Sequence, residues 1–268
     1  MELGLKGRTA VITGGSKGIG KSIAKGLAAE GVNVVLIARN KEMLAAAAEE
    51  IRKSSGVRVL AIPTDIKSAA AVKEAAEAAA AQFKSIHILV NNAGSAIRRF
   101  DRQINWPDTD WMDDIDGKMM GALRCVQAFL PHMPRDGSGR IVNISGIAGT
   151  SVLVKALTHG FNNSAMNHVT TYLAADLAAE KINVTAVVPG LISTEWREGW
   201  AENTAKQQGK TKEQFLADTC KSWGILAGRW GSMEEVADTV VFLASDRARY
   251  ITGTQIAVDG GYCVNSRG

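Results

Sequence analysis

The sequence predicts an α/β protein built on a doubly wound parallel sheet, with helices packed on both faces. Short runs rich in Val and Ile alternate with longer Ala- and Glu-rich segments along the chain of 268 residues. The short runs are continuously apolar, which is typical of strands buried on both faces of a parallel sheet. The regular alternation predicts right-handed helical crossovers between successive strands.

Seven segments have the length and composition of strands, which predicts a sheet of about seven strands. They are Thr9–Thr13, Asn33–Ala38, Val57–Ile62, Ile86–Val90, Arg140–Ile144, Asn183–Val188 and Gln255–Val258. Helix-forming segments lie between them, of which Met43–Lys53 and Ala69–Phe83 are clear examples. No internal repeat, Pro-rich linker or change of composition divides the chain, so residues 1–268 are expected to form one domain.

The segment 191–230, between the last two strands, interrupts this alternation. It is long and aromatic, and its tryptophans are Trp196, Trp200, Trp223 and Trp230. Ligands bind beyond the carboxyl ends of the strands in open parallel sheets, so an insertion here is expected to overhang a substrate site. Most of these tryptophans are expected to pack the insertion against the body of the protein, and one or two to line a pocket.

Composition and charge argue against several classes of protein. The net charge is +4 without a dense Lys/Arg run, so neither nucleic acid nor membrane lipid is an expected partner. Arg98, Arg99 and Arg102 are the nearest approach to a basic patch. A solvated loop is the favoured interpretation, and the alternative is that Arg98 and Arg99 meet an anionic substrate group. The sequence contains no signal peptide or membrane-spanning run. Its three cysteines lack metal or redox spacing, which predicts reduced thiols, no metal site and a cytoplasmic protein.

A glycine-rich turn follows the first strand and opens a helix. It reads Thr13-Gly14-Gly15-Ser16-Lys17-Gly18-Ile19-Gly20. Glycines at these spacings permit a tight turn and a close approach of the backbone to a pyrophosphate, while the helix N-terminus supplies free N–H groups. The turn therefore predicts a Rossmann-like dinucleotide site, and a purely structural turn is the less favoured alternative.

Further motifs resemble the short-chain dehydrogenase/reductase family over essentially the whole chain. The glycine turn resembles its TGxxxGxG motif, residues 91–94 its NNAG stretch, and residues 189–190 its PG motif beside the nicotinamide. The resemblance implies a small-molecule substrate and a homo-oligomer, a dimer or a tetramer. It also implies that the dinucleotide contacts Gly14, Ser16, Lys17, Gly18, Ile19, Gly20, Arg39, Asp65, Ile66, Asn92, Ala93, Gly94, Pro189, Gly190, Ile192 and Thr194.

Two positions favour NADP(H) over NAD(H). Family members selective for NAD carry an acidic residue at the end of the second strand, where it holds the ribose hydroxyls. Here that strand runs into Arg39-Asn40 without a carboxylate. Arg39 and Lys17 would instead pair with a 2′-phosphate, which suits guanidinium and ammonium donors. The alternative is that both are ordinary surface cations.

The family's acid/base motif, Tyr-x-x-x-Lys, does not occur in this sequence. The three tyrosines, Tyr172, Tyr250 and Tyr262, are followed four residues later by Asp176, Thr254 and Ser266. Aligned on the flanking residues, the resemblance places His159 at the family's Tyr, Asn163 at its Lys and Lys118 at its Asn. The family's Ser aligns best with Gly146, and a slip of one residue would bring Ser145 to that position.

The polar replacements predict a rebuilt reaction centre of His159, Lys118, Asn163 and Ser145. Histidine transfers protons near neutral pH, and His159 and Asn163 share a helix face because they lie four residues apart. Lys118 would return a cation to the same volume. The alternatives are a structural histidine at a helix start and a lysine that extends to solvent.

Three functions remain open at this point. The first is an NADP(H)-dependent oxidoreductase acting on a small carbonyl or alcohol. The second is a lyase, dehalogenase, hydrolase or group-transfer enzyme that holds the nicotinamide without net redox change, because a fold does not fix its chemistry. The third is an inactive partner subunit in an oligomer with an active homologue.

Overall fold

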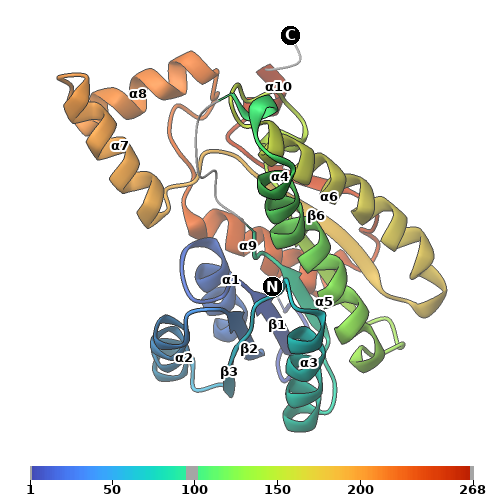
Figure 1. The fold of residues 1–268 in the computed structure, drawn as a ribbon. Coiled ribbons are helices and arrows are strands. Elements are labelled where there is room, and N and C mark those ends of the chain that lie inside the picture. The colour runs from blue at the N-terminus through green and yellow to red at the C-terminus, as the bar shows by residue number, and fades with distance from the viewer. Residues whose placement is uncertain (1, 95–101, 266–268) are drawn as a thin grey trace.

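The computed structural model describes residues 2–94 and 102–265 and has the predicted sheet (Figure 1). Within this part of the chain, seven parallel strands form one sheet in the spatial order β3-β2-β1-β4-β5-β6-β7. The strands are β1 (Thr9–Thr13), β2 (Asn33–Ala38), β3 (Val59–Pro63), β4 (Ile88–Asn91), β5 (Arg140–Ile144), β6 (Asn183–Pro189) and β7 (Gln255–Val258).

Helices cover both faces of the sheet, as the sequence predicts. Helices α1, α2 and α9 pack on one face, and α3, α5 and α6 on the other (Figure 1). The α-helices are α1 (Gly18–Ala29), α2 (Lys41–Ser55), α3 (Ala69–Phe83), α4 (Asp108–Ile115), α5 (Gly121–Phe129), α6 (Leu157–Asp176), α7 (Glu195–Gln207), α8 (Lys212–Trp223), α9 (Met233–Ala244) and α10 (Tyr262–Asn265). A π-helical turn, η2 (Asp116–Met120), joins α4 to α5, and the 3₁₀ turns are η1 (Gln103–Asn105), η3 (Leu130–His132), η4 (Ile147–Gly149), η5 (Ala178–Glu180) and η6 (Asp246–Ala248).

The core follows from the alternation of side chains along buried strands. Ile12 and Leu36 enter the apolar cluster beneath α1 and α9, whereas Val11 and Val35 enter the cluster beneath α3 and α5. Successive side chains of a strand point to opposite faces, so a sheet covered on both sides needs an uninterrupted apolar run. This requirement explains why β1 is buried at every position.

Three strands differ from the predicted bounds by one or two residues. β3 and β4 each begin two residues later than expected and end one residue later, and β6 extends to Pro189. The N–H of Ile86 donates to the carbonyl of His132 at 3.0 Å, so this residue is bonded to the loop after α5 and not to the sheet. Helix α2 is longer than predicted because Asn40 caps its N-terminus and Gly56, with φ +71°, ends it.

The segment between β6 and β7 folds into helices at the carboxyl ends of the strands. α7 and α8 extend away from the sheet (Figure 1), and an apolar cluster that includes Phe215 and Trp230 holds this segment. Thr211 and Gln214 form a capping box that starts α8. Among the described residues, no helix combines the length and the apolar character needed to cross a bilayer.

Candidate active site

The glycine turn after β1 packs against the end of β4. Thr13 Oγ1 accepts hydrogen bonds from the N–H groups of Asn92 (3.0 Å) and Ala93 (2.9 Å). Gly14 has φ +67°, and a Cβ there would lie 2.9 Å from Asn92 Nδ2. At Gly20, a Cβ would lie 2.4 Å from the carbonyl oxygen of Gly14. Glycine is therefore required at both positions for the turn to close.

The start of α1 is built to receive an anion. Lys17 occupies the N-cap position in an extended conformation, and its side chain does not cap the helix. The first N–H groups of α1, from Gly18 onward, are therefore not bonded to a capping side chain. Ser16 and Ile19 flank this point, and Gly18 adopts φ +56°. These features fit a pyrophosphate at the turn.

The remaining predicted cofactor residues lie at the carboxyl ends of neighbouring strands. Exposed Arg39 follows β2, and exposed Asp65 follows β3, where its Oδ1 accepts from the N–H of Lys67 at 3.0 Å. Ile66, Gly94, Pro189, Gly190, Ile192 and Thr194 complete the set at the ends of β3, β4 and β6. Arg39 and Asp65 thus follow β2 and β3 in one half of the sheet, whereas His159 and Thr194 follow β5 and β6 in the other half. An extended dinucleotide fits a site that spans both halves.

Lys118 is buried and its ammonium group is hydrogen-bonded within the protein. Only 7% of the residue is exposed. Its Nζ donates to Asn163 Oδ1 at 2.6 Å and to the carbonyl oxygen of Ser145 at 3.4 Å. The alternative that this lysine extends to solvent is therefore wrong. Burial lowers the pKa of Lys118 to about 8, and the negative charge of Asp114 partly opposes this effect.

Asn163 connects Lys118 to the backbone beneath His159. It is fully buried, and its Nδ2 donates to the carbonyl oxygen of His159 at 2.7 Å. Ser145 is also buried, and its Oγ has no hydrogen-bond partner among the described residues. The four predicted catalytic residues thus form one connected group.

Lys118 lies on the π-helical turn η2, which widens the helix between α4 and α5. Such turns insert one extra residue into a helix and often occur at functional sites. The Lys118 side chain passes directly over Gly94, where a Cβ would lie 3.1 Å from Lys118 Cδ. A side chain at residue 94 would therefore push Lys118 away from Asn163.

His159 lies in the first turn of α6 and lines a large pocket. Burial, together with the positive charges of Lys118 and Arg197, lowers the pKa of His159 to about 3. The imidazole is consequently neutral at physiological pH in the ligand-free protein. A histidine that lines a pocket differs from the structural helix-start histidine that was the alternative interpretation.

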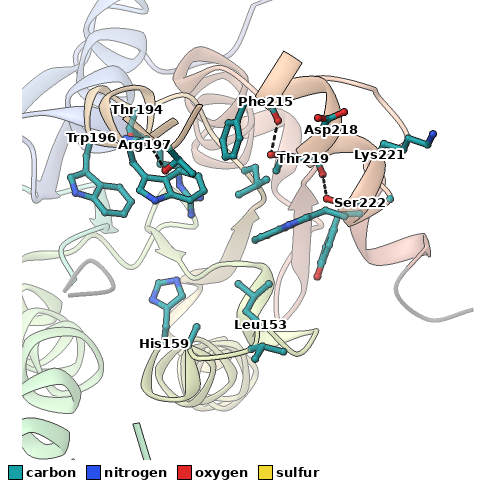
Figure 2. A pocket seen from close by; sticks show the side chains of 18 of the residues that line it. Leu153, His159, Thr194, Trp196, Arg197, Phe215, Asp218, Thr219, Lys221 and Ser222 are labelled. Carbon is teal, nitrogen blue, oxygen red and sulfur yellow. Dashed lines mark hydrogen bonds between the residues drawn. The ribbon is translucent and has the colours of Figure 1, made fainter. Parts of the chain in front are cut away.

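The pocket has a volume of about 1260 Å³ and lies between α6 and the α7–α8 segment. Figure 2 shows His159 rising from α6 on one side, with Trp196 and Arg197 of α7 on the opposite side. Among the predicted site residues, Lys17, His159 and Thr194 line this pocket. It therefore joins the start of α1 to the predicted reaction centre.

The tryptophans of the insertion line this pocket more than the sequence suggests. Trp196, Trp200 and Trp223 are lining residues, whereas Trp230 is buried and stacks on Trp200 with ring centroids 6.2 Å apart. The expectation that only one or two would line a pocket is wrong, because α7 and α8 face the pocket along much of their length.

Arg197 is a pocket residue that the sequence did not single out. It lies in the first turn of α7, where its N–H donates to Thr194 Oγ1 at 3.4 Å. Its position, in the first turn of the helix that follows the PG motif and on the same helix face as Trp200, is the signal that could have found it. Arg98 and Arg99, which the sequence suggested for an anionic group, lie outside the described residues.

Cysteine and metal chemistry find no support in the described part of the chain. Cys125, Cys220 and Cys263 form no disulfide with a described residue, and no group of three or more His, Cys, Asp or Glu side chains has metal-binding geometry there. Burial raises the pKa of Cys125 to about 12, so its thiol stays protonated.

Comparison with known proteins identifies the family. A family model described as enoyl-(acyl carrier protein) reductase matches residues 14–263. The chain is 36% identical over 255 residues to the 3-oxoacyl-[acyl-carrier-protein] reductase FabG of Staphylococcus aureus, covering 95% of this chain and 97% of that protein. The protein belongs to the short-chain dehydrogenase/reductase family.

Solved structures of this oxidoreductase family share the fold. The L-sorbose reductase of Gluconobacter frateurii, crystallised with NADPH and L-sorbose, superposes with a TM-score of 0.93 at 32% identity, covering 98% of this chain and 99% of that one. A short-chain dehydrogenase/reductase from Serratia marcescens has a TM-score of 0.84 at 31% identity and covers 97% of this chain and 99% of that one. The predicted Rossmann-like fold is confirmed.

Proposed function

We propose that the protein is an NADP(H)-dependent oxidoreductase that interconverts a small carbonyl compound and its alcohol. The observation that carries this proposal is the connected group Ser145–Lys118–Asn163–His159, which adjoins a pocket reached by the glycine turn. Family membership and the NADPH complex of the related L-sorbose reductase support it. Residues 1–268 would act as one dinucleotide-binding domain with 191–230 as its substrate segment.

The choice of NADP(H) over NAD(H) rests on cations near the cofactor turn. Lys17 and Arg39 are both exposed, and β2 ends without a carboxylate that would repel a 2′-phosphate. A guanidinium and an ammonium together would hold that phosphate by charge-assisted hydrogen bonds. The bound nicotinamide would supply or accept the hydride.

The four site residues would bind the carbonyl oxygen, stabilise its charge and transfer the proton. Ser145 Oγ–H would donate a hydrogen bond to the carbonyl oxygen, since this hydroxyl has no partner among the described residues. The ammonium of Lys118, fixed by Asn163, would stabilise the negative charge that develops on that oxygen. His159 would exchange the proton: as a neutral imidazole it accepts the proton of an alcohol in the oxidation direction.

The proposal is tested first by nucleotide binding. Titration with NADPH and NADH, followed by nucleotide fluorescence, should show tighter binding of NADPH. Arg39→Ala should weaken NADPH binding roughly tenfold or more while leaving NADH binding unchanged, because a charge-assisted hydrogen bond contributes about 1.5–3 kcal/mol. Equal binding of both nucleotides by the wild type would contradict the assignment.

The catalytic assignment is tested by His159→Ala with a panel of carbonyl substrates. Loss of a general acid/base is expected to lower kcat by roughly 10²- to 10⁴-fold while NADPH binding is retained. Arg229→Gln, which changes an exposed arginine paired with Glu235, is the control and should leave kcat unaltered. An unchanged rate in His159→Ala would show that another group transfers the proton.

A further inference from the structure

Arg197 and Lys221 are the cations of the α7–α8 segment that form no ion pair with a described residue, whereas the other three are paired. Lys206 pairs with Glu202 at 3.0 Å and Lys210 with Asp218 at 2.8 Å, and Lys212 forms an ion pair with Glu198. The Arg197 guanidinium forms neither an ion pair nor a hydrogen bond with any described residue. Its only bond at this point is the one from its main-chain N–H to Thr194.

The position of Arg197 makes this lack of a partner significant. The residue lines the pocket from the α7 side, opposite His159 on α6 (Figure 2). Its side chain is partly buried, and this burial lowers the pKa of Arg197. Taking a charge out of water without pairing it is unfavourable, so a negatively charged ligand would bind here with little competition from the protein itself.

The net charge of the pocket also favours a negatively charged ligand. Among the described lining residues, Lys17, Arg197, Lys210 and Lys221 are cationic, and Asp218 is the one carboxylate. Asp218 is already engaged by Lys210. Lys221 points away from His159 in Figure 2, and Lys17 belongs to the glycine turn, so Arg197 is the unpaired cation of the α7–α8 segment that lies opposite His159.

The walls around Arg197 are apolar and aromatic. Trp196, Trp200, Phe215 and Leu153 line the same pocket. Trp200 is held in place by an edge-to-face contact with Phe215, with ring centroids 5.5 Å apart, and by stacking on Trp230. Rigid aromatic walls combined with one placed cation are the pattern of a site that recognises an apolar body bearing an anionic group.

We propose that Arg197 is a specificity-determining residue that binds the carboxylate of the substrate, and that the substrate is an oxo or hydroxy acid with an apolar or aromatic body. The planar guanidinium matches a carboxylate through two parallel hydrogen bonds. Anchored there, the acid would keep its apolar part against the tryptophans and its carbonyl toward His159. This inference rests on the proposed oxidoreductase function.

A direct binding experiment tests it without requiring turnover. Benzoate and its neutral isostere benzamide are titrated into the full-length protein, with and without NADPH, while tryptophan fluorescence is recorded. Benzoate should bind at least tenfold more tightly than benzamide. Arg197→Gln should weaken benzoate binding roughly 10- to 100-fold and leave benzamide binding unchanged, as expected for loss of a charged hydrogen-bond donor.

Two further variants test whether the geometry and the position of the Arg197 guanidinium are needed, in addition to its charge. Arg197→Lys retains the charge but not the paired donors, so its benzoate affinity should fall between those of the wild type and Arg197→Gln. Lys221→Gln removes a cation from the rim of the same pocket and should have no effect. If benzoate and benzamide bind equally to the wild type, or if Lys221→Gln weakens benzoate as much as Arg197→Gln does, the proposal is overturned.

Measuring NADPH binding in the same variants distinguishes a failure of this proposal from a failure of the proposed function. NADPH affinity should be the same in Arg197→Gln and in the wild type. A large loss of NADPH affinity would assign Arg197 to a cofactor phosphate and would overturn the carboxylate proposal. Benzoate binding that depends on Arg197 in a protein that does not bind NADPH would uphold the anion site while refuting the oxidoreductase function.

Discussion

At the residue scale, burial and two neighbouring cations together keep the imidazole of His159 neutral. Lys118 and Arg197 both lower the pKa of His159, and burial acts in the same direction to bring it to about 3. A carboxylate bound to Arg197 would neutralise one of these charges and raise the pKa of His159. Substrate binding would thus bring the imidazole closer to the pH range in which it exchanges protons efficiently.

Lys118 should make the stability of the protein depend on pH in an identifiable way. Its pKa is about 8 in the folded protein, whereas the ordinary pKa of a lysine is 10.5. Between these pH values the unfolded chain binds more protons at this site, so the free energy of unfolding should rise with pH. Below about pH 8 the lysine is protonated in both states, and the destabilisation from burying its charge is fully present.

Urea denaturation of the wild type and Lys118→Met at pH 7 and pH 10 measures this effect. The wild type should gain on the order of 2 kcal/mol more than Lys118→Met over this interval, because one pKa unit corresponds to about 1.4 kcal/mol. Other groups titrate in both proteins, so the difference between them isolates Lys118. Lys53→Met, which alters an exposed lysine of α2, should follow the wild type. Parallel pH profiles for Lys118→Met and the wild type would show that the ammonium is not buried in solution.

At the scale of elements, the close packing of η4 against α6 positions His159 and Asn163. A Cβ at Gly149 would lie 2.6 Å from the carbonyl carbon of Asn163 and 2.8 Å from the nitrogen of Ser164. These are backbone atoms that cannot rotate away. Gly149→Ala would therefore shift α6, and with it the bond between Lys118 and Asn163.

We expect Gly149→Ala to lower the free energy of unfolding by about 1–3 kcal/mol, the range typical of overpacking. Gly199 on α7 is the matched control, since a Cβ there meets no atom within 4 Å. Gly199→Ala should stabilise the protein by about 0.5–1 kcal/mol through its higher helix propensity. Thermal unfolding of both variants measures these changes in stability. Equal effects of the two substitutions would contradict the packing argument.

The sequence predicted the helices and strands better than it predicted the tertiary contacts between them. Continuous Val/Ile runs predicted every strand, because burial on both faces leaves a local signature, whereas strand ends depended on tertiary bonds such as that of Ile86. Spacing alone placed His159 and Asn163 on one helix face. The spacing of Arg197 and Trp200 on α7 could have indicated Arg197 as a pocket residue, but only the structure shows that its guanidinium forms no ion pair with Glu195 or Glu198.

At the scale of the whole molecule, α6 presents an apolar face to solvent. Phe161 (49% exposed) and Tyr172 (61%) lie on its outer side, and Met112 of α4 is 61% exposed. Figure 1 shows the continuous helical run of α4, η2 and α5 lying beside α6. Apolar residues grouped on one face of a soluble protein mark a surface for association, and two copies of one face can pack about a twofold axis. We therefore predict a homo-oligomer assembled through these helices, a dimer or a tetramer.

Light scattering coupled to size-exclusion chromatography tests this assembly. The wild type should elute as a dimer or a tetramer, and the double variant Phe161→Glu/Tyr172→Glu as a smaller species, because a carboxylate buried in an apolar interface is strongly unfavourable. Tyr250→Glu is the control: this tyrosine is 99% exposed and lies in the loop before β7, so its replacement should leave the mass unchanged. A monomeric wild type would refute the prediction. If the double variant dissociates yet retains NADPH binding, each protomer carries a complete cofactor site, consistent with the strand ends of one chain supplying every predicted cofactor residue.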